Sequence, residues 1–235
     1  MPNPSNKTGQ LEGYAGPLSP EMIAAGMNAA LRNATRLAGD AQFLLERKSY
    51  ATAASLAALS IEESGKITVL RGLAVAKSPQ EIKAEWRRYR DHRSKNGMWI
   101  LTSLYTNGAR TLKDFAKVVE RDGEHTALLN TLKQLGFYTD CYDKALWAEP
   151  ENLFNEDLAK TLVEVATILA KPKSFSIREV ELWIQHLSPV WRTPDMANGI
   201  LLWAEAMVQE GLGETTASEY AKFITGECLA SKGSK

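Results

Sequence analysis

Apolar residues recur every three to four positions along most of the chain, which is the spacing of amphipathic helices. One such run, from Ile23 to Leu45, directly follows Ser19-Pro20-Glu21, an N-cap residue with proline at the first helical position. Ser78 and Ser176 each precede a glutamate by three residues, which is the capping-box pattern. Together these signals predict helices over residues 20–47, 50–76, 79–95, 111–136, 155–170, 177–187, 195–209 and 217–229.

Residues 137–151 lack this periodicity and are interpreted as a long ordered loop, with Tyr138, Tyr142 and Trp147 anchoring it to the core. Strand signals are weak and no internal repeat is present, so the predicted fold class is all-α. Lys171-Pro172 interrupts the helical pattern. We therefore expect three parts, namely a flexible segment over 1–19, a helical-bundle domain over 20–170 and a C-terminal helical extension over 171–235.

Composition limits the function classes that need consideration. The chain of 235 residues is 44% hydrophobic and carries 28 basic and 28 acidic residues, so its formal net charge is zero. Any affinity for nucleic acid must therefore come from a local patch. Cys141 and Cys228 lack metal-ligand or redox spacing. No apolar run approaches the roughly 20 residues of a membrane span, so we expect a cytoplasmic protein that does not bind membranes.

The predicted helix over 79–95 carries a local surplus of positive charge around a histidine. Between Lys83 and Lys95 the basic residues are Lys83, Arg87, Arg88, Arg90, Arg93 and Lys95, against two acids, Glu85 and Asp91. On a straight helix Arg88, His92 and Lys95 share one face, whereas Arg87 lies off it. A histidine among fixed cations can cleave a phosphodiester without a metal, because it moves protons while the cations stabilise the phosphorane. The alternative is a solvated basic face with a surface histidine.

Glu62, Glu63 and Lys66 occupy the helix before this basic segment. Intrahelical pairing at spacings of three and four would explain them as surface residues. Because the acids follow an apolar stripe, the other reading places at least one of them near the bundle interior. A buried glutamate needs a partner, and the arginine-rich helix would supply one.

Motifs for metal or cofactor chemistry are absent from the sequence. Helical di-iron sites use Glu-x-x-His pairs, and the residues three before His92, His125 and His186 are Tyr89, Asp122 and Trp183. The chain also has no glycine-rich phosphate loop and no His-Glu-x-x-His. We therefore expect neither a metal site nor a cofactor.

Three segments in order resemble the AbiV family of bacterial abortive-infection proteins. They are Glu62-Glu63-Ser64-Gly65-Lys66 within 33–70, Tyr89-Arg90-Asp91-His92-Arg93-Ser94-Lys95, and Gly136-Phe137-Tyr138-Thr139-Asp140 followed by Trp147 and Pro150. The resemblance covers about residues 22–169. This family is similar to the HEPN superfamily of helical bundles, which often dimerise and, when catalytic, cleave RNA without a metal through Arg-x(4–6)-His. Arg87 and His92 fit that motif, whereas Arg88 stands one residue too close.

The resemblance implies a phage-defence effector with an HEPN-like bundle, acting as a metal-independent endoribonuclease that halts translation. His92 would be the general acid/base, Arg87 or Arg88 the phosphate stabiliser and Lys95 an auxiliary cation. Glu62, Glu63 and Lys66 would orient these groups, and Lys83, Arg90 and Arg93 would bind RNA. The implied partners are a second copy of the chain, a tRNA, rRNA or mRNA substrate, and a phage-encoded activator protein. The alternative is a non-catalytic RNA- or protein-binding module of a defence or toxin-antitoxin system.

Overall fold

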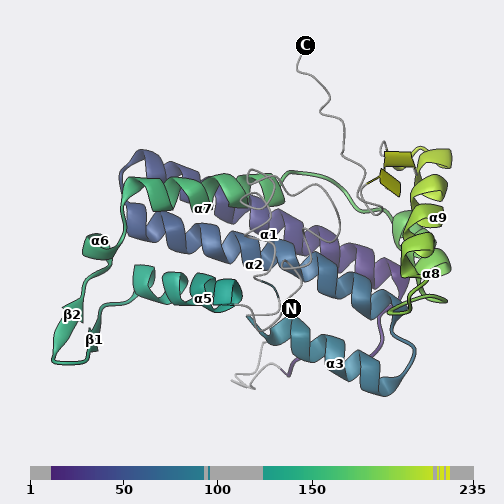
Figure 1. Ribbon diagram of the computed structural model, residues 1–235, viewed down its shortest axis with the longest axis horizontal. Helices are drawn as coiled ribbons and strands as arrows, with labels where there is room; N and C mark the ends of the chain where they lie inside the picture. Colours follow the sequence, from purple (N-terminus) through teal and green to yellow (C-terminus); the bar gives the residue numbers. More distant parts are fainter. Residues whose placement is uncertain are drawn as a thin grey trace, which may run out of the picture.

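A computed structural model describes residues 12–92, 95, 124–213, 216, 218, 219, 221 and 222, with 124–126 described by their backbone. Two long helices, α1 (Pro20–Glu46) and α2 (Tyr50–Val75), lie side by side at the centre (Figure 1). Ser19 caps α1 by accepting a hydrogen bond from the Met22 N–H at 3.3 Å. A short connection through Lys48, at φ 62°, makes the two helices antiparallel neighbours. Both helices end within a residue of the predicted positions.

The middle helix of the bundle is α2. It packs against α1, α3 (Pro79–Arg90), α5 (Glu124–Phe137), α7 (Glu156–Leu169) and α8 (Ile177–Leu187). A helix covered on so many sides is apolar nearly all round, and α2 buries alanines such as Ala53, Ala54, Ala57 and Ala58. Their small side chains let the neighbouring helices approach closely. Glu62 lies on this helix and is 4% exposed, so the interpretation of a buried glutamate is confirmed.

Three apolar clusters run along the α1/α2 pair. The first joins it to α5 (Glu124–Phe137) and α7 (Glu156–Leu169) through Leu129 and Leu162, among others. The second joins it to α3 through Trp86, with Phe175 and Val180 from beyond the break at 171. The third covers Val75 with α8 (Ile177–Leu187) and α9 (Met196–Gln209). The fold is all-α, as the periodicity predicts.

The basic helix is shorter than predicted. α3 (Pro79–Arg90) begins with the expected capping box between Ser78 and Glu81, but Asp91 is extended at φ −81° and ψ 121°. His92 and Lys95 therefore lie beyond the helix, and the prediction that they share a helix face with Arg88 is wrong. The cause is tertiary, because the backbone of Lys95 rests against Gly65 of α2, which has no side chain to hold it away.

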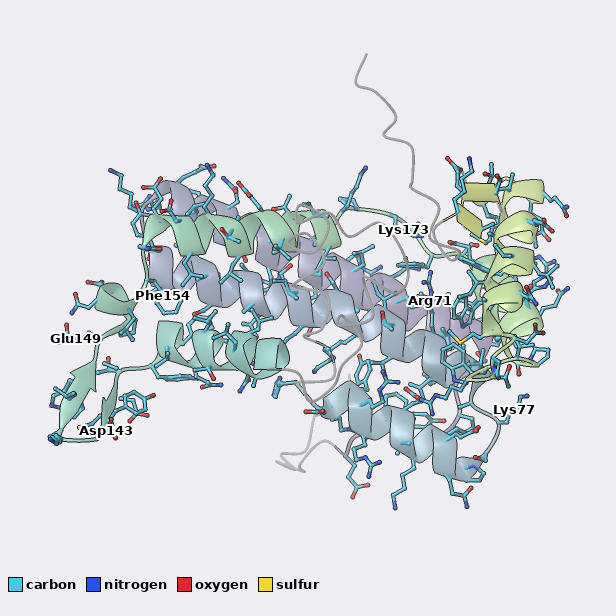
Figure 2. The ribbon with its side chains drawn as sticks, viewed as in Figure 1. Arg71, Lys77, Asp143, Glu149, Phe154 and Lys173 are labelled. Atoms are coloured by element: carbon cyan, nitrogen blue, oxygen red, sulfur yellow. The ribbon has the colours of Figure 1, made fainter. Side chains whose placement is uncertain are left out.

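Most of the predicted loop over 137–151 forms a projecting hairpin that is not anchored to the core. β1 (Asp140–Tyr142) pairs antiparallel with β2 (Leu146–Ala148), and α6 (Pro150–Leu153) follows. Asp143, in the turn, points away from the bundle in Figure 2, whereas Phe154 lies where the chain rejoins it. The anchoring prediction is wrong, since Tyr138, Tyr142 and Trp147 are 62%, 46% and 70% exposed. Two strands alone have no second layer to cover their side chains.

The C-terminal helices agree with their sequence signals. Ser176 and Glu179 form the second predicted capping box, and Asn155 caps α7 through the Leu158 N–H at 2.9 Å. The start of the predicted helix over 111–136, and most of the one over 217–229, lie outside the described residues. In the N-terminal segment, the Gly16 carbonyl accepts a hydrogen bond from Trp86 Nε1 of α3 at 2.8 Å. The three-part division of the chain stays a prediction.

Candidate functional site

The site is built around the buried carboxylate of Glu62, which two other segments approach. Its Oε2 lies 2.8 Å from His92 Nδ1, just past the end of α3, and its Oε1 accepts a hydrogen bond from Lys133 Nζ of α5 at 2.6 Å. Both distances are at the short end for N–H···O bonds, as expected when the donor or the acceptor is ionised. One carboxylate on the central helix therefore ties together residues 30 and 71 positions away in sequence.

The position of His92 determines which of its ring nitrogens is available to accept a proton from a ligand or solvent. Nδ1 faces a carboxylate oxygen, which can only accept a hydrogen bond, so Nδ1 carries the proton in the neutral ring. Lys133 Nζ is farther from Nδ1, at 3.5 Å. The His92 side chain is 59% exposed, whereas Glu62 is 5% exposed. A neutral imidazole held in this way offers Nε2 to solvent as a proton acceptor.

Further cations surround this pair. Lys66 Nζ lies 2.6 Å from Glu63 Oε1 and 5.3 Å from the centre of the Tyr89 ring. Lys95 is 6% exposed, and its burial lowers its pKa, an effect that Lys66 and Lys133 add to and that Glu62 and Glu63 oppose. The structure thus brings the predicted residues Glu62, Glu63, Lys66, His92 and Lys95 into one neighbourhood.

The two candidate arginines have different surroundings. Arg88 pairs with Glu85, with Nη1 3.1 Å and 2.9 Å from the two carboxylate oxygens. Glu85 is 2% exposed, and it also accepts a hydrogen bond from Arg192 Nη2 at 2.6 Å. Arg87 is exposed in the last turn of α3, and its carbonyl accepts the Asp91 N–H at 3.0 Å. Within the described ranges Arg88 is engaged by a structural ion pair, whereas Arg87 faces solvent.

The residues predicted to bind RNA differ in whether other parts of the protein already engage their side chains. Lys83 is exposed on α3. Arg90 is also exposed, yet its Nη2 donates to Tyr14 O at 2.5 Å and its guanidinium lies 5.3 Å from the centre of the Trp86 ring. Arg90 therefore also holds the N-terminal segment on α3. Arg93 lies outside the described residues.

Sequence reasoning missed Lys133, although a signal for it existed. Lys133 follows Leu129 by four residues, so both lie on one face of α5, and both are buried. A lysine on the apolar face of a helix requires an acidic partner from elsewhere. The predicted arginine-rich segment over 79–95 does supply one partner of the buried glutamate, His92, and the other partner, Lys133, comes from α5.

Within the described ranges no group of three or more His, Cys, Asp or Glu side chains is arranged to hold a metal ion. No described helix has both the length and the apolarity needed to cross a bilayer.

Most of the chain matches a known protein family. The model of the HEPN family AbiV matches residues 22–171, which include the Glu62–His92 pair and Lys133. Comparison with curated proteins and with solved structures found no match. The family match spans well over half of the chain and the helical bundle described above. This chain therefore belongs to the AbiV family of the HEPN superfamily.

Proposed function

We propose that this protein is an abortive-infection effector that cleaves RNA without a metal ion, with His92 as general base. The observation that carries the proposal is the contact between Glu62 Oε2 and His92 Nδ1 at 2.8 Å, made by a buried carboxylate to an exposed imidazole. A carboxylate on one ring nitrogen orients the ring and stabilises the imidazolium that forms when the other nitrogen takes a proton. A surface histidine with no catalytic role does not need such a partner.

The reaction that this arrangement suits is internal transesterification. His92 Nε2 removes the proton of a ribose 2′-hydroxyl, and the 2′-oxygen attacks the adjacent phosphorus. The bond from phosphorus to the 5′-oxygen breaks, and that oxygen takes a proton from a second acid. The products are a 2′,3′-cyclic phosphate and a 5′-hydroxyl. In a homodimer the second acid would be the same histidine of the other copy.

Arg87 is the better candidate for stabilising the phosphorane. Arg88 is held by Glu85, and moving it would leave that buried carboxylate with Arg192 alone. Arg87 is exposed on the turn that leads to His92, and its spacing from His92 fits the Arg-x(4–6)-His pattern. Lys95, close to Glu62, would add positive charge, and Lys83 would contact the RNA backbone.

Purified full-length protein incubated with total RNA and with tRNA, with and without EDTA, tests this proposal. We expect cleavage that survives chelation and leaves 2′,3′-cyclic phosphate or 3′-phosphate ends. Products with 3′-hydroxyl ends, or activity lost on chelation, would contradict a metal-independent mechanism. In the host cell the same activity should stop growth.

Paired variants separate chemistry from folding. His92→Gln should lower turnover by about 100-fold or more, because general acid–base catalysis contributes about 10²–10⁴. His186→Gln makes the same change at the end of α8, away from the Glu62–His92 pair, and should keep full activity. Arg87→Ala should be as inactive as His92→Gln, with Arg36→Ala on α1 as its control. Full cleavage and full toxicity in His92→Gln would refute the nuclease proposal.

The rival function is a non-catalytic module in which the exposed basic residues of α3 hold RNA or a protein. It is favoured by the exposure of Lys83 and Arg87 on one short helix. Wild-type protein that binds RNA with a steep salt dependence but leaves it uncut would establish this rival. A phage-encoded activator would be recognised by cleavage that begins only when infected-cell extract is added.

A further inference from the structure

We propose that Lys133 is a positioning residue for His92. It holds the Glu62 carboxylate in position, so that this carboxylate fixes the imidazole with its proton on Nδ1. The inference rests on the proposed function only in assigning His92 as the base. The tautomer itself is a property of the folded protein.

Glu62 is buried on the central helix, with its side chain 5% exposed. A buried carboxylate is costly unless an opposite charge and hydrogen bonds compensate it. The arrangement around His92 therefore depends on a positive charge that stays beside Glu62.

Lys133 supplies that charge at the closest distance among the described cations. Its Nζ lies 2.6 Å from Glu62 Oε1, and its side chain is 7% exposed. Lys95 is also near Glu62, but burial lowers its pKa and so weakens its hold on a proton. The ammonium of Lys133 occupies one carboxylate oxygen and leaves the other, Oε2, directed at Nδ1.

The distances around His92 Nδ1 indicate which way each hydrogen bond runs. Lys133 Nζ is 3.5 Å from His92 Nδ1, whereas Glu62 Oε2 is 2.8 Å from it. An ammonium and a ring N–H are both donors, so the carboxylate between them must accept from both. The shorter contact assigns the proton to Nδ1. The lone pair then stands on Nε2, the nitrogen that would remove the 2′-hydroxyl proton.

Stability alone does not account for a lysine in this position. Replacing a buried ion pair by apolar residues of similar size is often neutral or stabilising. Lys133 shares a face of α5 with Leu129, which is buried in the main apolar cluster, so an apolar side chain would suit this face. A role in orienting Glu62 explains why this position carries a lysine, whereas packing alone does not.

The experiment compares Lys133→Met with Lys160→Met in the full-length protein. Methionine has a similar length and no charge, and Lys160 is exposed on α7, away from Glu62. The ¹⁵N chemical shifts of the His92 ring, assigned with His92→Gln, report which nitrogen carries the proton. Circular dichroism and thermal unfolding confirm that each variant is folded.

We expect Lys133→Met to move part of the His92 proton from Nδ1 to Nε2, while Lys160→Met leaves it unchanged. In the same variant kcat for RNA should fall by about 10-fold or more, with KM unchanged, as is typical when the partner that orients a histidine is lost. Because Lys133 acts through Glu62, adding Lys133→Met to Glu62→Gln should cause no further change. If Lys133→Met does not fold, Lys133→Gln replaces it.

A folded Lys133→Met protein that keeps the proton on Nδ1 would overturn the inference, as would full kcat in that variant. Additive effects in the double variant would also overturn it. If wild-type protein cleaves no RNA, the proposed function fails, and the ring-nitrogen comparison still decides the role of Lys133.

Discussion

Replacing Gly65 by alanine tests the energetic weight of the close contact between α2 and the Lys95 backbone. A Cβ at this position would lie 2.9 Å from the carbonyl carbon of Lys95 and 3.0 Å from its Cα, and closer still to its oxygen. These atoms are backbone, so no rotation of a side chain can relieve the overlap. The Lys95 backbone would have to move away from α2.

The magnitude follows from two opposing terms. Alanine in a helix interior is about 1 kcal/mol more favourable than glycine. Overpacking of a tight contact costs about 1–3 kcal/mol, and the rigid neighbour places Gly65→Ala in the upper part of that range. We expect a net loss of about 1–2 kcal/mol, which lowers Tm by about 2–8 °C in a chain of this size.

Gly39→Ala is the matched control for this substitution. Gly39 lies in α1, and a Cβ there would meet nothing within 4 Å. The same chemical change should therefore stabilise the protein by about 0.5–1 kcal/mol and raise Tm. The difference between the two variants isolates the contact with Lys95.

Thermal unfolding and RNA cleavage are the two assays. Besides its lower Tm, Gly65→Ala should lose RNA cleavage by about 10-fold or more, because a shift of about 1 Å in a reacting group can cost 10²-fold. Gly39→Ala should keep its activity. A Gly65→Ala protein that is stabilised as much as Gly39→Ala, with full activity, would refute the placement of Lys95 on Gly65.

Two further predictions concern other charged residues. Arg192→Ala removes one of the two partners of the buried Glu85 and leaves Arg88, so it should lower the free energy of unfolding, measured in urea, by about 1–2 kcal/mol. Arg178→Ala breaks exposed pairs with Glu181 and Glu210 and should cost less. An equal loss in the two variants would show that the burial of Glu85 does not raise the cost of losing a partner. Burial lowers the pKa of Lys95, so this side chain holds its proton more tightly in the unfolded chain than in the folded protein. The stability of wild type relative to Lys95→Met should therefore rise as the pH increases through the alkaline window below 10.5. Denaturation curves from pH 7 upward measure this difference, and a flat difference would contradict the burial of the Lys95 ammonium.

Much of the fold could be predicted from short segments of the sequence. The helix starts at Ser19, Ser78 and Ser176 depend on residues within one turn, and the structure has their caps where the pattern places them. Helical periodicity over 50–76 likewise indicated that Glu62 follows an apolar stripe. These features are local, so neighbouring residues suffice to encode them.

The site depended on contacts between distant segments. The end of α3 at Arg90 is determined by Lys95 resting on Gly65, although charge and periodicity alone would continue the helix. The Glu62–Lys133 bond joins residues 71 positions apart, and the Glu85–Arg192 bond joins residues 107 apart. Neither pairing has a local signal that names the partner.

The sequence by itself therefore determined the helices, the all-α class and a set of candidate residues around His92. The tertiary structure decided which of them act together. It assigned Arg88 to Glu85, left Arg87 exposed and brought Lys133 to Glu62. The physical reason is that a helix forms from hydrogen bonds and side-chain spacing within a few residues, whereas a buried charge is neutralised by whichever opposite charge the packing of the bundle brings within hydrogen-bond distance.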